Sequence, residues 1–113
     1  KYPEGKKDTC YTIPDSVTEI RYGAFQGCSR LTSVTIPSSV TKIGLGAFWH
    51  CISLTSATYF GNTEPEHKKY IFSGCNKLSR VKVPADYEGD NFCGKQVVID
   101  HSCDVQKVTD SEN

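Results

Sequence analysis

A chain of 113 residues has room for one domain, and its 13 basic and 13 acidic side chains leave no net charge. This balance provides no basic surface for neutralising phosphates, so nucleic acid is not an expected partner. No apolar run approaches the roughly 20 residues of a membrane span, and no apolar segment resembles a secretory signal.

The sequence repeats itself with a period of 23 or 24 residues. The segment 11–33, YTIPDSVTEIRYGAFQGCSRLTS, returns at 34–56 as VTIPSSVTKIGLGAFWHCISLTS, and a third copy keeps Phe72, Cys75 and Leu78. Repeats of about 20–29 residues that each contain one short alternating run are typical of leucine-rich-repeat solenoids. We therefore predict a leucine-rich-repeat solenoid, a short right-handed stack of about 3.5 repeats.

Each repeat is predicted to contain two short extended segments and a tight turn. In 31–37, LTSVTIP, apolar and polar side chains alternate, which predicts a strand that ends at Pro37. A second short extended segment is expected at 40–43, and GAFWHC at 46–51 is expected to form a tight helical turn. The stack should therefore consist mainly of parallel strands and turns, with little helix.

We divide the chain into three parts. Residues 1–9 are expected to form an N-terminal cap or leader, and residues 10–100 the repeat domain with an irregular C-terminal cap. The tail at 101–113 is expected to be disordered, as its polar composition and terminal position indicate. The segment 61–70, GNTEPEHKKY, breaks the period and is a charged connection that either carries recognition or is simply solvated.

The pattern IPxSVTxIxxGAFxxCxxLTSVTIP resembles the BspA-like, or Treponema-type, leucine-rich repeat family. The resemblance covers about Cys10 to Gly94, and its last part is similar to the terminal repeats of protozoan surface members. It implies a non-enzymatic surface or secreted module that binds a host or microbial protein or glycan. The alternative is an intracellular, cytoplasmic scaffold in which all cysteines are reduced.

Three cysteines, Cys28, Cys51 and Cys75, share one repeat position and should form a column on the inward face of the stack. Small buried thiols suit a core, so a structural role is predicted. A metal or redox ladder is the alternative, although the sequence contains no CxxC pair of the kind that zinc sites use.

The C-terminal cysteines, Cys93 and Cys103, either form a disulfide that staples the tail or remain free thiols, and a mixed pairing that involves Cys10 and another chain is a further alternative. With His101 they have an odd spacing for zinc, so no metal and no cofactor are expected. The remaining histidines offer no nucleophile and base pair, because His50 and Cys51 are adjacent on a turn and point in different directions. No hydrolase or nucleotide-binding motif occurs, and an enzyme is not expected.

The outward positions of the long strands form a candidate binding surface. Its candidate residues are Thr12, Ser33, Thr35, Ser56, Thr58, Arg80 and Lys82. Solenoids often bind partners on such a face, but threonine and serine also simply suit exposed strands. Both interpretations stay open at this stage.

A second candidate surface is aromatic. Trp49 aligns with Gln26 of the preceding repeat, and Tyr22 and His50 occupy variable positions nearby. Trp49 is either an exposed contact residue or lies flat on a neighbouring repeat. The ends and edges of the stack also offer a route to a homodimer.

Overall fold

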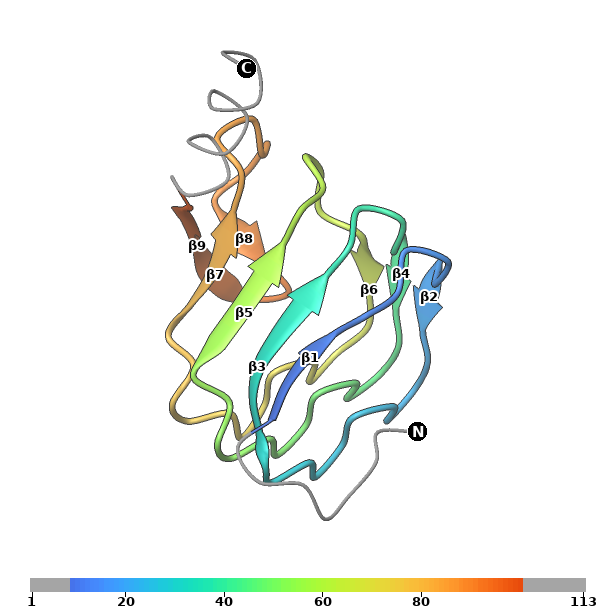
Figure 1. Ribbon diagram of the computed structural model, residues 1–113, viewed down its shortest axis with the longest axis vertical. Helices are drawn as coiled ribbons and strands as arrows, with labels where there is room; N and C mark the ends of the chain where they lie inside the picture. The colour runs from blue at the N-terminus through green and yellow to red at the C-terminus, as the bar shows by residue number, and fades with distance from the viewer. Residues whose placement is uncertain (1–8, 101–113) are drawn as a thin grey trace.

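The structure, a computed structural model, describes residues 9–100 and shows a β-solenoid (Figure 1). These residues contain strands and turns but no helix, which confirms the predicted leucine-rich-repeat solenoid. The strands are β1 (Thr9–Thr12), β2 (Glu19–Ile20), β3 (Leu31–Ile36), β4 (Lys42–Ile43), β5 (Ser56–Tyr59), β6 (Glu66–His67), β7 (Arg80–Val83), β8 (Asn91–Phe92) and β9 (Lys95–Ile99).

The strands form two sheets on different sides of the coil (Figure 1). The longer sheet has the order β1-β3-β5-β7-β9-β8, and all its pairs are parallel except β8 with β9. The shorter sheet consists of β2, β4 and β6, one strand from each of three coils. Thr35 pairs with Thr58 and Thr58 with Lys82, so the sequence period equals the register of the sheet.

The core is a ladder of equivalent side chains from successive coils. Phe25 stacks on Phe48 with ring centroids 4.9 Å apart, and Phe48 stacks on Phe72 at 5.4 Å. Phe92 packs against the far end of this ladder, 6.3 Å from the ring of Phe72. Each coil thus buries the apolar face of its neighbour, as the repeat predicts.

The segments expected as tight helical turns are turns in which amides that bond to the next coil alternate with amides that bond within the turn. In 23–28, the amide of Cys28 bonds to the carbonyl of Phe25 within the turn, but the amide of Phe25 bonds to Ala47 at 2.7 Å. The amide of Phe48 bonds in the same way to Ile71 at 2.9 Å. At every second residue a bond between coils thus takes the place of the bond that a helix would make within itself.

The C-terminal part is more regular than the irregular cap that the sequence predicts. Strands β8 and β9 form a hairpin whose two-residue loop, Cys93 and Gly94, has φ of 50° and 87°. Positive φ at both loop residues is the geometry of a type I′ turn, which matches the twist of the flanking strands. Strand β9 also pairs with β7 and so extends the parallel sheet.

The segment 61–70 is also more ordered than its broken period implies. Its residues Glu66 and His67 form β6, which pairs with Lys42 and Ile43 of β4. Partner residues are 23 positions apart up to Tyr59 and 24 positions apart from Glu66 onward, so the extra residue of this repeat lies between Tyr59 and Glu66. The shorter sheet continues through β6 without interruption. The predicted leader and tail concern residues 1–8 and 101–113, which lie outside the described residues.

Two buried tyrosines, Tyr59 and Tyr87, make the stability of the fold decrease at alkaline pH. The hydroxyl of Tyr59 donates to the carbonyl of Thr63 at 3.0 Å, and that of Tyr87 donates to Asn91 at 2.7 Å. Burial raises the pKa of both side chains above their ordinary value of about 10. The folded chain therefore holds protons that the unfolded chain releases, so this stabilisation is complete below about pH 10 and is lost as the pH rises further.

We expect the urea midpoint to fall above about pH 10 and the fall to be shallower in Tyr87→Phe, which has no phenolic proton to release. Urea unfolding at a series of pH values measures this slope. An equal slope in the parent and the variant would contradict the assignment of the effect to Tyr87.

Candidate functional site

The structure places the predicted sheet residues on one face in two columns. Thr12, Thr35, Thr58 and Lys82 are successive partners in one column, and Ser33 pairs with Ser56 in the other. Arg80 and Lys82 are exposed, while the serines and the two central threonines are half-buried. Strand β9 adds Gln96 beside Arg80 and Val98 beside Lys82. Binding by this hydroxylated face with its basic edge stays a prediction.

A second surface is formed by an aromatic cluster of Trp49, His50 and Tyr70. The ring of Trp49 stacks on His50 with centroids 5.4 Å apart and on Tyr70, in the next coil, at 5.8 Å. Trp49 is half-buried, whereas His50 is exposed and Tyr70 is 57% exposed. Trp49 therefore covers a neighbouring coil, and its two stacking partners face solvent.

The exposed apolar surface continues beside the cluster. An open groove is lined in part by Tyr22, Leu45, Lys69 and Tyr70, and Tyr22 is 75% exposed. Aromatic side chains of this kind provide most of the energy at protein interfaces, because they combine a large apolar area with a polar tip. Tyr70 did not emerge from the sequence as a candidate, although it stands where earlier repeats have glycine.

Two members of the cluster have backbone conformations that favour glycine. Tyr70 has φ of 63°, and Gly23 and Gly46 hold the same position in earlier coils with φ of 63° and 61°. His50 has φ of 62° at the position that Gly27 and Gly74 occupy in the adjacent coils. A bulky side chain in this region is strained, and strained residues cluster at functional sites. This pattern makes the aromatic cluster the stronger candidate surface.

The strain at Tyr70 leads to a stability prediction. Tyr70→Gly should be more stable than Tyr70→Ala by about 1 kcal/mol, because both lose the ring but only alanine keeps a Cβ in the left-handed region. Urea unfolding of the two variants measures the difference. An alanine variant as stable as the glycine variant would show that the backbone at this position is not strained.

The predicted thiol column is buried. Cys28, Cys51 and Cys75 are each at most 2% exposed. The thiol of Cys51 donates to the carbonyl of Phe25 at 3.0 Å, and that of Cys75 donates to Phe48 at 2.9 Å. Contact with the Cys75 thiol, together with burial, raises the pKa of Cys51, so this sulfur stays protonated and unreactive. The column suits packing between coils.

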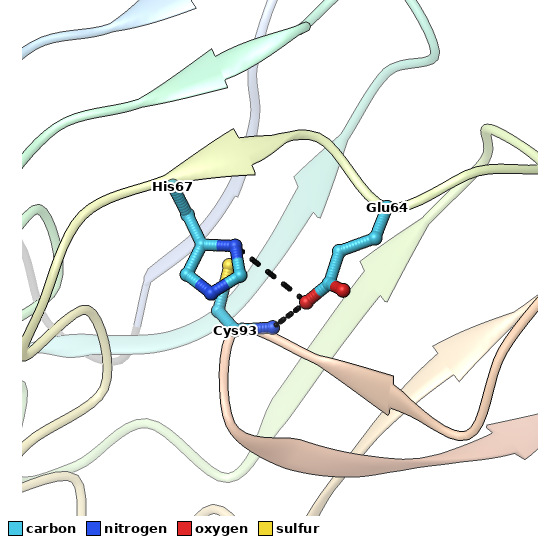
Figure 2. Close-up of side chains that lie close together, drawn as sticks. All are labelled: Glu64, His67 and Cys93. Atoms are coloured by element: carbon cyan, nitrogen blue, oxygen red, sulfur yellow. Dashed lines mark hydrogen bonds and ion pairs between the residues drawn. The ribbon is translucent and has the colours of Figure 1, made fainter.

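The structure also brings together three side chains that the sequence did not link: Glu64, His67 and Cys93 (Figure 2). Their possible ligand atoms all lie within 4.8 Å of one another. The backbone amide of Cys93 donates to Oε2 of Glu64 at 2.7 Å, and the same oxygen lies 3.6 Å from Nδ1 of His67. The three residues come from the segment around β6 and from the hairpin turn, so no sequence motif contains them all.

This group does not have the electrostatics of a cysteine nucleophile. Burial, and then the neighbouring Glu64 carboxylate, raises the pKa of the Cys93 thiol. A catalytic cysteine requires the opposite shift, since the thiolate is the reactive form. Cys93 is a free thiol in the structure, and its predicted disulfide partner Cys103 lies outside the described residues, so that bridge stays a prediction.

Coils of 23 or 24 residues, a parallel sheet on one side and a phenylalanine ladder inside define a leucine-rich-repeat solenoid. The family model described as "BspA type Leucine rich repeat region (6 copies)" matches residues 5–99, and the chain belongs to this family.

A solved structure with the same fold is the crystal structure of a leucine-rich cell surface protein from Faecalibacterium prausnitzii. It is 26% identical with a TM-score of 0.55, and the match covers 88% of this chain and 34% of that one. This chain thus corresponds to about a third of the bacterial protein. No curated protein matches the sequence.

Proposed function

We propose that this chain is a non-enzymatic binding module of a surface or secreted BspA-type repeat protein, and that it contacts a protein or glycan through the aromatic cluster. The family and the bacterial structure described as a cell surface protein support the location. The fold supports a binding role, because solenoids present extended surfaces to partners.

The observation that carries this proposal is the tyrosine at a glycine position. Tyr70 keeps a strained backbone with φ of 63° and yet leaves its ring 57% exposed. The ring stacks on Trp49, but more than half of the side chain stays in solvent, so burial accounts for only part of a residue that costs of order 1–3 kcal/mol in backbone strain. A ring that is retained at such a cost and stays exposed is best explained by contact with a partner.

The binding test uses the labelled 113-residue chain on a printed glycan array and on an array of extracellular proteins. We expect the chain to bind a restricted set of features in a saturable manner. Absence of saturable binding on both arrays would contradict the proposal.

The second candidate is an intracellular scaffold. It is favoured by Cys10, Cys51, Cys75 and Cys93, which are free thiols, as in a reducing compartment. Within residues 9–100 no helix has the length and apolar character needed to cross a bilayer.

Treating intact expressing cells with a membrane-impermeant amine reagent separates the two candidates. Labelling without lysis supports the surface module, and labelling only after lysis supports the scaffold.

A further inference from the structure

Glu64, His67 and Cys93 form a group that includes no residue of the aromatic cluster. Figure 2 shows the three side chains converging from two segments, with the sulfur of Cys93 beside the imidazole of His67. The Glu64 and His67 side chains are 33% and 32% exposed, so an ion in solvent can reach them. Cys93 is 9% exposed and forms the inner side of the group.

The spacing of the donor atoms suits a small cation. Zinc binds sulfur at about 2.3 Å and nitrogen or oxygen at about 2.0–2.2 Å, so tetrahedral donors lie about 3.3–3.6 Å apart. Oε2 of Glu64 and Nδ1 of His67 already lie 3.6 Å apart, and no pair in the group exceeds 4.8 Å. Small side-chain rotations would bring all three donors to bonding distance.

Among the described residues, the ion-pair partner of Glu64 is His67, which is charged only when its ring is protonated. The Glu64 carboxylate stands within 4.8 Å of the Cys93 sulfur. A divalent cation between them would stabilise both the carboxylate and a thiolate. One carboxylate and one thiolate would then balance the two positive charges of the ion.

We propose that Glu64, His67 and Cys93 form a zinc site with an open fourth position for water. The mixture of carboxylate, imidazole and thiolate ligands selects a borderline-soft ion, since magnesium and calcium prefer oxygen ligands alone. Binding breaks the S–H bond of Cys93, forms a zinc–sulfur bond and releases one proton to solvent. The sequence alone predicts no metal site, because the only metal ligands that it places near Cys93 are His101 and Cys103, at a spacing that does not suit zinc.

The surroundings of the group orient its ligands. Nδ1 of His67 lies 3.2 Å from the carbonyl oxygen of Pro65, and it must carry no proton to bind zinc, so the neutral ring would hold its proton on Nε2. The amide of Cys93 bonds to Oε2 of Glu64. Such secondary contacts hold the ligands of metal sites in place. The ion would join the segment around β6 to the hairpin turn and so fix the C-terminal hairpin against the preceding coil.

The test is a titration of the reduced 113-residue chain with Co²⁺, followed by displacement with Zn²⁺. We expect the charge-transfer absorption of a cobalt–thiolate bond at one equivalent, and Zn²⁺ should abolish it. Zinc should also raise the thermal midpoint, because an ion that binds only the folded state stabilises it. Absence of the cobalt–thiolate absorption would overturn the proposal.

Three variants assign the ligands. Glu64→Gln keeps an oxygen that can accept the hydrogen bond from the Cys93 amide but loses the negative charge. His67→Asn removes the imidazole of an exposed residue, and Cys93→Ser removes the sulfur. Each should weaken zinc binding by at least about tenfold, the loss that even orienting residues cause. The controls His50→Asn, Cys10→Ser and Cys103→Ser should bind as the parent does. Unchanged affinity in Glu64→Gln and His67→Asn would overturn the site even if cysteine variants lose binding.

Discussion

Replacing Phe48 with alanine should lower the free energy of unfolding by about 3–5 kcal/mol, the usual cost of removing a fully buried phenylalanine. Phe48 is 0% exposed and lies between Phe25 and Phe72, so its loss leaves a cavity in the middle of the ladder. Total stabilities of domains are about 5–15 kcal/mol, so this loss is a large part of the free energy of unfolding. Urea unfolding followed by circular dichroism measures the change.

The matched control is Phe60→Ala. Phe60 is 47% exposed and belongs to the same residue type, so its loss should change stability by no more than about 0.5 kcal/mol. Similar effects at the two positions would contradict the assignment of Phe48 to the central ladder.

The second large effect is expected from Gly44→Ala, at about 3 kcal/mol, the upper end of the range for overpacking. Gly44 directly follows β4 of the shorter sheet, and its amide bonds to the carbonyl of Ile20 at 2.7 Å. A Cβ at this position would collide with the backbone nitrogen of Tyr22 and lie 2.9 Å from the carbonyl carbon of Arg21. Backbone cannot move aside as a flexible side chain can, so the two coils would have to separate.

Gly27→Ala is the control for this prediction. A Cβ at Gly27 meets no atom within 4 Å, and only its φ of 73° disfavours alanine, at a cost of about 1 kcal/mol. Urea midpoints of the two variants give the comparison. A larger loss in Gly27→Ala would show that contact between coils is looser than the structure indicates.

The fold could be predicted from the sequence because identical positions stack in a solenoid. Once Thr35 and Thr58 are aligned in the repeat, the register of the parallel sheet follows, and the structure pairs these residues. The hairpin of β8 and β9 could not be predicted in this way, since the period ends before it. Its turn residues, Cys93 and Gly94, also differ from the usual Asn-Gly signal.

The candidate sites were harder to predict from the sequence than the fold, for two different physical reasons. Tyr70 could have been found, because it replaces a glycine that recurs with positive φ in earlier coils. The group of Glu64, His67 and Cys93 depends on the hairpin turning back toward β6, and 29 residues separate Glu64 from Cys93. Only the three-dimensional structure brings that pair together.

The central claim is that the chain recognises its partner through the aromatic cluster. The most direct test is to take a glycan or protein that the parent chain binds on the arrays and to measure its dissociation constant by equilibrium titration. The titration compares the parent with two double variants, His50→Gly with Tyr70→Gly, and Arg80→Ala with Lys82→Ala. We expect the first pair to weaken binding by at least about tenfold, the size of a hot-spot loss, and the second to change it less than about twofold. Binding that survives the glycine pair but fails with the alanine pair would contradict the claim and move recognition to the exposed sheet.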